Sequence, residues 1–268
     1  MLDFDAYLQR LGLSGADAPS WRAIHRAQAT SIPFENLDSH RGIPVSLAQE
    51  DIERKLVTDR RGGYCFEHNL LLAAALEHLG LRVEPILARV RVGGSPPEAR
   101  PATHLLLRVT DGDATAWHAD VGFGLGTLLD PIPFGADPDR VHEQSGWSFR
   151  VVQDGAELVL QTLGANGWSE VYGFVPQPTP RIDIEVSNWW TCTNPRSPFV
   201  FGLIASINHD DGRREAISDW SGPLQVITMA PGGVESSEQP RSAIPAKLEQ
   251  FGLPGFALGE DGRVHERS

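Results

Sequence analysis

The segment CFEHNLLLAAALEHLG, residues 65–80, most limits how this chain can fold. Residues 70–76 are all leucine or alanine and Leu79 follows, so a helix built from the segment is apolar almost all round. Other elements must cover such a helix on every side, and Gly80 is a natural C-terminal stop. The segment therefore predicts a buried central helix that begins at about Cys65.

The flanking segments predict two kinds of structure. Before the central helix, residues 2–11 and 21–30 have helical apolar spacing, Ser20 stands at an N-cap position, and Ser46 precedes a third helix. After it come short β-rich segments separated by Gly, Pro and Asp, which predict an antiparallel barrel or sandwich. These segments are residues 82–92, 103–110, 115–123, 147–154 and 156–163. From about Ile182 the pattern predicts a smaller mixed α/β unit.

The net charge of −12 disfavours binding to nucleic acids and docking on anionic membranes. Two cysteines cannot build a disulfide framework. The N-terminus does not resemble a secretory leader, and no apolar run is long enough to cross a bilayer. We therefore expect a cytoplasmic protein, because thiols stay reduced there.

Cys65 follows the sequence RRGGY and lies in the first turn of the predicted helix. A thiolate is the reactive form of cysteine, and its pKa falls near a helix N-terminus or a protonated histidine. The two glycines leave room for a substrate, and the turn exposes N–H groups able to hold an oxyanion. The alternative is a buried packing residue, which is the commoner role of a free cysteine.

A nucleophilic cysteine needs a base, and the chain has nine histidines. Six of them lie in polar, helical or turn contexts and are expected at the surface: His25, His40, His78, His142, His209 and His265. His68 forms a C-x-x-H spacing with Cys65. No second Cys/His pair follows at a suitable distance, so no metal site is predicted.

His104 is the best candidate for the base. It begins a strand that turns at DGD and returns as TAWHADVGF. If the hairpin centres on Gly112, His104 and Asp120 are directly opposed on one face, with Cβ atoms about 4.5–5.5 Å apart. Asp120 would then orient the imidazole and leave its other nitrogen for Cys65. A two-residue turn would put the pair out of register, and a pair that only ties the hairpin together is the other interpretation.

Further side chains are weaker candidates. Gly122, Gly124 and Gly126 would let a ligand approach the backbone closely, although most glycine loops are turns. Phe34 and Phe123 are candidates to line an apolar pocket. Another possible contact is an ion pair between Glu35 and Arg61 that braces the loop before Cys65, with a surface pair of no consequence as the alternative.

Four blocks in this order resemble the arylamine N-acetyltransferases: IPFENLD, RRGGYCFEHN, THLLLRV and DVGFG, with a weaker match at NPRSPFVFGL near residue 200. The resemblance implies a catalytic triad of Cys65, His104 and Asp120. It also implies an α+β fold with a cysteine-protease-like core. Its three parts would be an N-terminal helical bundle (1–82), a central antiparallel β-barrel (83–182) and a C-terminal α/β lid with an interdomain helix (183–268).

The resemblance also implies the substrates. The donor would be acetyl-coenzyme A, and the acceptors arylamines, arylhydrazines and N-hydroxyarylamines, with no metal. By position, the acceptor pocket would be lined by Phe34, Phe123 and Phe199, and coenzyme A would approach Thr103, Gly124 and Gly126. The segment NWWTCTNP departs from the family pattern. Because Trp189, Trp190 and Cys192 stand in this segment, a larger or differently shaped acyl donor is an alternative.

The implied mechanism is two-step acyl transfer through a Cys65 thioester, with ping-pong kinetics. Two alternatives use the same triad: a macrolactam-forming amide synthase of the same superfamily, and a transglutaminase-like cysteine hydrolase. A third is a binding module in which Cys65 only packs. The sequence gives no oligomeric state.

Overall fold

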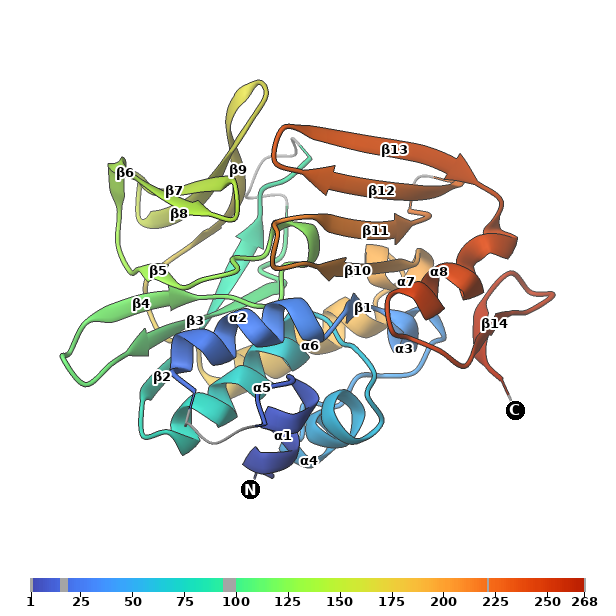
Figure 1. Ribbon diagram of the computed structural model, residues 1–268, viewed down its shortest axis with the longest axis horizontal. Coiled ribbons are helices and arrows are strands. Elements are labelled where there is room, and N and C mark those ends of the chain that lie inside the picture. Colours follow the sequence, from blue (N-terminus) through green and yellow to red (C-terminus); the bar gives the residue numbers. More distant parts are fainter. Residues whose placement is uncertain (1, 15–18, 94–99, 221, 268) are drawn as a thin grey trace.

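The computed structural model describes residues 2–14, 19–93, 100–220 and 222–267. In Figure 1 a group of helices lies at the bottom, an eight-stranded sheet at the left and a five-stranded sheet at the upper right. None of the helices in these ranges has both the length and the apolar character needed to span a membrane. The α+β class is confirmed.

The predicted central helix is α5 (Cys65–His78), and most of its side chains are buried. The helices that precede it are short: α1 (Phe4–Arg10), α2 (Trp21–Ser31), α3 (Leu37–His40), α4 (Gln49–Glu53) and the π-helical turn η1 (Arg54–Thr58). Ser20 caps α2 as predicted, since its side chain accepts the N–H of Ala23. The cap predicted at Ser46 is wrong. The N-cap of α4 is Ala48, and Ser46 bonds to the side chain of Asp51 instead.

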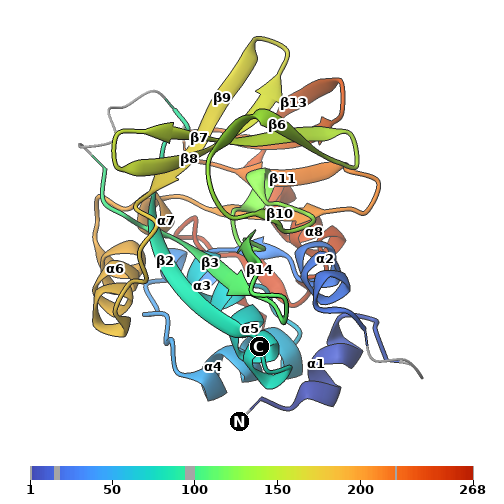
Figure 2. The same cartoon turned by 90° about the vertical axis from the view of Figure 1, so that its left-hand side faces the viewer.

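The eight-stranded antiparallel sheet curls into a nearly closed barrel, so the predicted barrel is confirmed (Figure 2). Its spatial order is β5-β4-β3-β2-β9-β8-β7-β6. The strands are β2 (Arg82–Val90), β3 (His104–Thr110), β4 (Ala116–Ala119), β5 (Ile132–Pro133), β6 (Asp137–Gln144), β7 (Trp147–Asp154), β8 (Glu157–Gly164) and β9 (Gly167–Phe174). Three of them, β5, β6 and β9, lie outside the segments predicted as strands.

Strand β3 lies between two apolar cores. Leu105, Leu107 and Val109 belong to the core built around α5, whereas Leu106 belongs to the core inside the barrel. Successive side chains of a strand point to opposite faces. Strand β3 therefore packs on α5 with one face and on the core inside the barrel with the other.

The C-terminal sheet has the order β1-β10-β11-β12-β13. Its strands are β1 (Phe34–Glu35), β10 (Ile204–Asn208), β11 (Arg214–Ser218), β12 (Leu224–Ala230) and β13 (Gly233–Gln239). The other elements of this part are α6 (Arg181–Thr193), α7 (Pro198–Phe201), η4 (Arg241–Ala243), α8 (Ile244–Gln250), β14 (Phe256–Leu258) and β15 (Val264–Glu266). Because Phe34 pairs with Ser206, a strand that precedes the nucleophile belongs to this C-terminal sheet.

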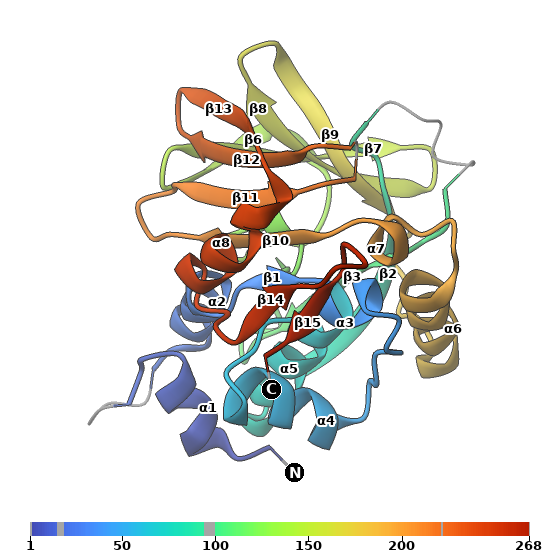
Figure 3. The same ribbon diagram turned by 90° about the vertical axis from the view of Figure 1, so that its right-hand side faces the viewer.

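The hairpin β14–β15 returns to the N-terminal helices, and Figure 3 shows it in front of them. The Glu266 carboxylate lies 2.7 Å from Arg41 and 3.6 Å from Arg61, and Arg263 donates to the backbone carbonyl of His40. The end of the chain is thus tied to the segment that leads to Cys65.

Candidate active site

Cys65 is the first residue of α5, as predicted. Tyr64 precedes it with an extended backbone, and the Glu67 carboxylate accepts the Tyr64 N–H at 3.1 Å. A Cβ on Gly62 would lie 2.1 Å from the Pro33 carbonyl oxygen, so only glycine fits there. The sequence before Cys65 therefore fixes a tight turn that leads straight into the buried helix.

The Cys65 sulfur lies against the backbone on both sides of His104. Its Sγ is 3.5 Å from the carbonyl oxygen of Thr103, and a backbone hydrogen bond from Leu105 also reaches it. The side chain is almost completely buried, with 4 % of its surface exposed. The beginning of β3 is therefore the wall that faces the nucleophile.

The predicted contact between His104 and Asp120 is confirmed. His104 Nε2 lies 2.8 Å from Asp120 Oδ2, and both side chains are buried. Because an ionised carboxylate can only accept, the imidazole donates through Nε2–H. Nδ1 is then the nitrogen that remains for the thiol.

The predicted register of the hairpin is wrong. Leu107 pairs with Ala119 and Thr110 with Ala116, so the hairpin centres on Asp113 rather than Gly112. The cause is Asp111, whose carboxylate accepts two N–H groups of the loop and widens it. Moving the centre by one residue shifts the pairing by two. Asp120 is therefore diagonal to His104 but still on the same face.

Four donors hold the Asp120 carboxylate. His104 and the Tyr172 hydroxyl, at 2.8 Å each, reach Oδ2, and the Asn69 amide at 3.0 Å and the Gly122 N–H at 2.9 Å reach Oδ1. Burial alone would raise the pKa of Asp120. The His104 charge and these hydrogen bonds outweigh burial and hold the pKa well below its usual range. Asp120 is therefore an anion.

Three buried side chains near Asp120 had no assigned role in the sequence. The Nε2 of His25 on α2 accepts the backbone N–H of Asp120, and its Nδ1 lies 3.0 Å from the Leu129 carbonyl. Tyr172 comes from β9, and its hydroxyl lies 2.8 Å from His118 Nε2. No sequence pattern links these residues to Asp120, because they come from elements distant in the chain.

The surface location expected for two histidines is wrong. His25 and His40 are buried, because other elements cover the helices that carry them. His68 is buried too, and its Nε2 contacts the Pro33 carbonyl oxygen at 3.2 Å. Across the described residues, no group of three or more His, Cys, Asp and Glu side chains gathers as metal ligands would.

Burial raises the pKa of the Cys65 thiol to about 12, and the charge of Asp120 adds to this rise. Backbone hydrogen bonds from Leu105 and Phe66 oppose it but do not cancel it. A lone Cys65 is therefore a neutral thiol at pH 7. The helix N-terminus alone does not ionise it, so a nucleophilic Cys65 would need a base to take its proton.

The three predicted pocket phenylalanines lie in two places. Phe123 packs edge-on against the His104 imidazole, with centroids 4.8 Å apart. The ring centroids of Phe34 and Phe199 lie 6.1 Å apart, and Phe199 also packs on Tyr64. Aromatic rings therefore lie beside both the base and the turn that carries Cys65.

The predicted coenzyme A residues lie near the same rings. The Thr103 carbonyl faces the sulfur. A Cβ on Gly124 would lie 3.3 Å from the hydroxyl of Ser206, and one on Gly126 would lie 2.5 Å from the Phe123 ring. The space at Gly126 is thus filled by Phe123, whereas Gly124 faces a buried hydroxyl that has no partner among the described residues.

Trp189 lies on the outer face of α6 with 62 % of its surface exposed, so it does not line the site. Cys192 is buried on the same helix. The connection from α6 to the site is Asn188, whose side chain hydrogen-bonds to the Tyr64 hydroxyl.

A buried ion-pair cluster lies behind the turn. The predicted pair of Arg61 and Glu35 is confirmed at 2.8 Å, and Glu35 is fully buried, so this is not a surface pair. Lys55 lies 2.7 Å from both Asp38 and Glu67. Burial raises the pKa of Glu67 to about 7. The carboxylate that accepts the Tyr64 N–H therefore lies in surroundings that disfavour its charged form.

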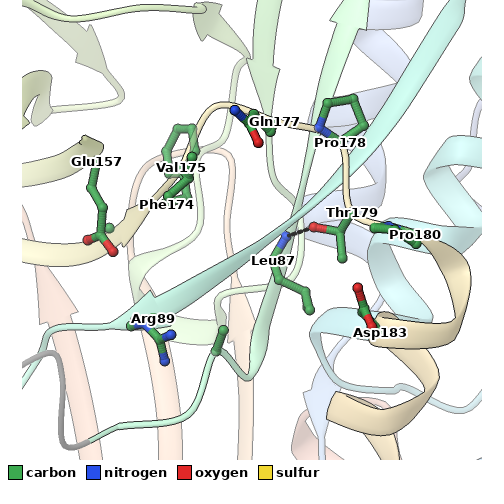
Figure 4. Close-up of a pocket in the computed structure, with 12 residues that line it drawn as sticks. Leu87, Arg89, Glu157, Phe174, Val175, Gln177, Pro178, Thr179, Pro180 and Asp183 are labelled. Carbon is green, nitrogen blue, oxygen red and sulfur yellow. Dashed lines mark hydrogen bonds between the residues drawn. The ribbon is translucent and has the colours of Figure 1, made fainter.

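A cleft of about 320 Å³ lies on another part of the surface, between β2, the end of β9 and the start of α6 (Figure 4). Its lining includes Arg89, Phe174, Thr179 and Asp183. Cys65, His104 and Asp120 do not line it. The cleft is therefore separate from the contacts of Cys65, His104 and Asp120 described above.

Comparison with known proteins agrees with this geometry. Residues 17–221 match the family model described as N-acetyltransferase. The arylamine N-acetyltransferase of Mycobacterium tuberculosis is 38 % identical, over 99 % of this chain and 94 % of its own length. The arylamine N-acetyltransferase of Escherichia coli is 36 % identical, over 92 % and 87 %. The solved structure of Mycobacterium marinum arylamine N-acetyltransferase in complex with CoA superposes with a TM-score of 0.85 at 34 % identity, covering 94 % and 93 % of the two chains.

Proposed function

Because the chain belongs to the arylamine N-acetyltransferase family, we propose that its Cys65 carries the acetyl group between the two substrates. The reaction is the acetyl-coenzyme A-dependent N-acetylation of arylamines. The observation that carries the role of Cys65 is the place of its sulfur, at the start of a buried helix and against the backbone that flanks His104. The matches favour neither the amide synthase nor the hydrolase.

The residues around Cys65 fit a thioester substrate. The first turn of α5 has backbone N–H groups with no partner inside the helix, and such groups stabilise a developing oxyanion. The unpartnered Ser206 hydroxyl beside Gly124 can hydrogen-bond a polar group of the donor. Coenzyme A would thus lie along the Thr103 and Gly124 side of the site.

In the first half-reaction His104 Nδ1 takes the proton of Cys65 while the sulfur attacks the acetyl carbonyl carbon. Asp120 stabilises the imidazolium that forms. As the tetrahedral intermediate collapses, His104 returns the proton to the sulfur of coenzyme A. The old carbon–sulfur bond breaks, and Cys65 is left acetylated. One thioester has replaced another, so the step has little thermodynamic cost.

In the second half-reaction the amine nitrogen attacks the Cys65 thioester, and His104 takes the proton that the nitrogen loses. The bond from carbon to Cys65 breaks, and His104 protonates the sulfur again. Phe34, Phe123 and Phe199 supply apolar surface for an aryl ring. Hydrazines belong to the proposal as acceptors, since they are also neutral nitrogen nucleophiles.

The division of labour is proposed as well. Residues 1–82 supply the nucleophile, 83–182 the base and its carboxylate, and 183–268 the Phe199 side of the pocket. The gaps between α5 and β2 and between β9 and α6 lie next to these boundaries, although each boundary falls just inside the element that follows the gap. A cytoplasmic location is proposed because both cysteines are free, and a nucleophilic thiol needs a reducing compartment.

The test is acetylation of the protein by acetyl-coenzyme A without an acceptor. We expect intact-mass spectra to show one added acetyl group, which 5-aminosalicylate or isoniazid then removes as the N-acetyl product. Cys65→Ala should take up no acetyl group, whereas Cys192→Ala, at the only other cysteine, should be labelled like the wild type. A labelled Cys65→Ala protein would refute the assignment. Release of free acetate at the same rate with and without amine would indicate a hydrolase instead.

A further inference from the structure

A second line of hydrogen bonds reaches Asp120 from inside the barrel. The Tyr172 hydroxyl on β9 lies 2.8 Å from Asp120 Oδ2, and His118 Nε2 on β4 lies 2.8 Å from the same hydroxyl. All three side chains are buried. The acyl-transfer steps above make no use of His118, although only two hydrogen bonds separate it from Asp120.

The direction of these hydrogen bonds follows from the protons available. Asp120 is an anion and can only accept, so Tyr172 gives it the one proton that a hydroxyl has. Burial raises the pKa of Tyr172 well above its usual range, which keeps that proton in place. The Tyr172 oxygen must then accept from His118, whose Nε2 carries a hydrogen. The line runs from His118 to Tyr172 to Asp120, with every donor pointing toward the carboxylate.

We propose that His118 is a positioning residue for acyl transfer, which acts through Tyr172 to hold the Asp120 carboxylate and to set how strongly it stabilises positive charge on His104. A hydroxyl that accepts a hydrogen bond becomes a better donor, because neighbouring bonds polarise one another. The inference rests on the proposed function and deepens it by adding a residue that touches neither substrate nor thiol.

Other groups face Asp120 from every element packed against it. His104 from β3, Asn69 from α5 and the Gly122 N–H from the loop after β4 contact the carboxylate. His25 from α2 accepts the backbone N–H of Asp120. Burial lowers the pKa of both His25 and His118 to about 4, so both are neutral above pH 6. A change at His118 is therefore read through the reactivity of Cys65, whose proton His104 takes in the proposed mechanism.

Without His118, Tyr172 donates more weakly and the Asp120 carboxylate keeps more of its charge. The His104 imidazolium is then better stabilised, so the proton of Cys65 passes to His104 more readily. Iodoacetamide attacks the thiolate, which therefore forms at lower pH. Alkylation of Cys65 should shift to lower pH.

The experiment measures the rate of Cys65 alkylation by iodoacetamide against pH, in the Cys192→Ala background and without acetyl-coenzyme A. His118→Phe removes the donor but keeps an aromatic ring, which can still pack against Phe174 as the imidazole does. We expect its profile to move down by about half a pH unit. We also expect kcat/KM for acetyl transfer to fall roughly three- to tenfold, because a more strongly held imidazolium returns its proton to the leaving sulfur less readily. His118→Gln keeps a nitrogen donor near the same place and should restore most of both values.

A packing control is available at Phe134, whose ring lies 6.4 Å from the His118 ring. Phe134→Leu disturbs the same cluster without touching the hydrogen bonds, so its profile should match that of the wild type. Tyr172→Phe removes the middle of the line. Adding His118→Phe to Tyr172→Phe should therefore shift the profile no further.

Two results would overturn the proposal: a His118→Phe profile that matches the Phe134→Leu control, or a shift that is equally large with and without the Tyr172 hydroxyl. Failure of the proposed function would look different. In that case wild-type protein would not transfer acetyl groups to arylamines, whereas the alkylation profiles need no substrate and would still report on His118.

Discussion

At the scale of single residues, Cys65 combines two opposed demands. Burial excludes water from the thioester, yet it also raises the pKa of the thiol to about 12. In the proposed mechanism, transfer of the proton to His104 resolves the conflict, because the pair then carries no net charge and Asp120 is already ionised beside it. The proposal thus makes the reactivity of the thiol a property of the pair.

His104→Gln tests this dependence. Glutamine can still donate to Asp120 but cannot take the thiol proton. Alkylation of Cys65 at pH 7 should slow by two orders of magnitude or more, since the thiolate fraction falls about tenfold for each unit that separates its pKa from the pH. The rate should then climb steadily up to pH 10. His142→Gln, on β6, is the control. An unchanged rate at pH 7 would show that His104 does not take the proton of Cys65.

Hairpin logic found the contact between His104 and Asp120 because an odd loop keeps both residues on one face, even though the predicted centre was one residue too early. The same logic has no access to Tyr172, His118 or His25. Their partners lie on other elements, and a lone buried histidine carries no local signal. The resemblance supplied the triad but not these contacts.

At the scale of elements, the loop after β4 packs directly on the start of α5. A Cβ on Gly122 would lie 2.8 Å from the Cys65 Cα and equally close to the Asn69 amide nitrogen. The contact with Cys65 would be with backbone atoms, which cannot move away by a change of rotamer. The absence of a side chain at Gly122 is what lets the loop and the helix meet.

Gly122→Ala should therefore force the loop away from α5. We expect the free energy of unfolding to fall by about 1–3 kcal/mol, as for other overpacked sites. Acetyl transfer should fall much further, because the shift moves Asp120 relative to Cys65. Gly112→Ala is the matched control, since a Cβ there meets nothing within 4 Å. Urea unfolding and single-turnover acetylation measure the two effects, and a fully active Gly122→Ala enzyme would contradict this account.

Strand prediction worked where apolar residues were frequent and failed where they were not. The β6 sequence DPDRVHEQ is mostly exposed and polar, so no pattern marks it as a strand. The β9 sequence GWSEVYGF contains two glycines, and only its last four residues are buried. Both strands owe their conformation to neighbours already in the sheet, and such neighbours are invisible in a local window.

At the scale of the whole molecule, several buried histidines make folding sensitive to acid. Burial lowers the pKa of His25, His68 and His118 to about 4, from an ordinary value of 6.5. Above pH 6.5 these residues are neutral in both the folded and the unfolded chain. As the pH falls toward 4, the unfolded chain gains protons that the folded chain does not. Each residue then costs up to about 3 kcal/mol of stability.

We expect the free energy of unfolding to be roughly constant above pH 7 and to drop steeply between pH 6.5 and 4. Near pH 5 its slope should correspond to about two to three protons taken up on unfolding by these three side chains. Urea titrations at half-unit pH steps give the slope. A flat curve down to pH 4.5 would show that the buried histidines are protonated in the folded state.

The three-part order implied by the resemblance does not anticipate β1. This two-residue strand precedes Cys65 in sequence but pairs with β10 in the C-terminal sheet. Such a pairing leaves no trace in periodicity, because two residues carry no period and the partner is more than 160 residues away. Phe34 is thereby held beside Phe199.

The pairing of β1 with β10 also determines when parts of the chain can pack during synthesis on the ribosome. The helix that begins with Cys65 is translated early, with apolar side chains around most of its circumference, and stays uncovered until the barrel has been made. Phe34 has no strand to pair with until Ser206 has been translated. A nascent chain halted after α5 but before β10 would expose apolar surface and lack a complete active site, so chaperone demand should peak late in translation.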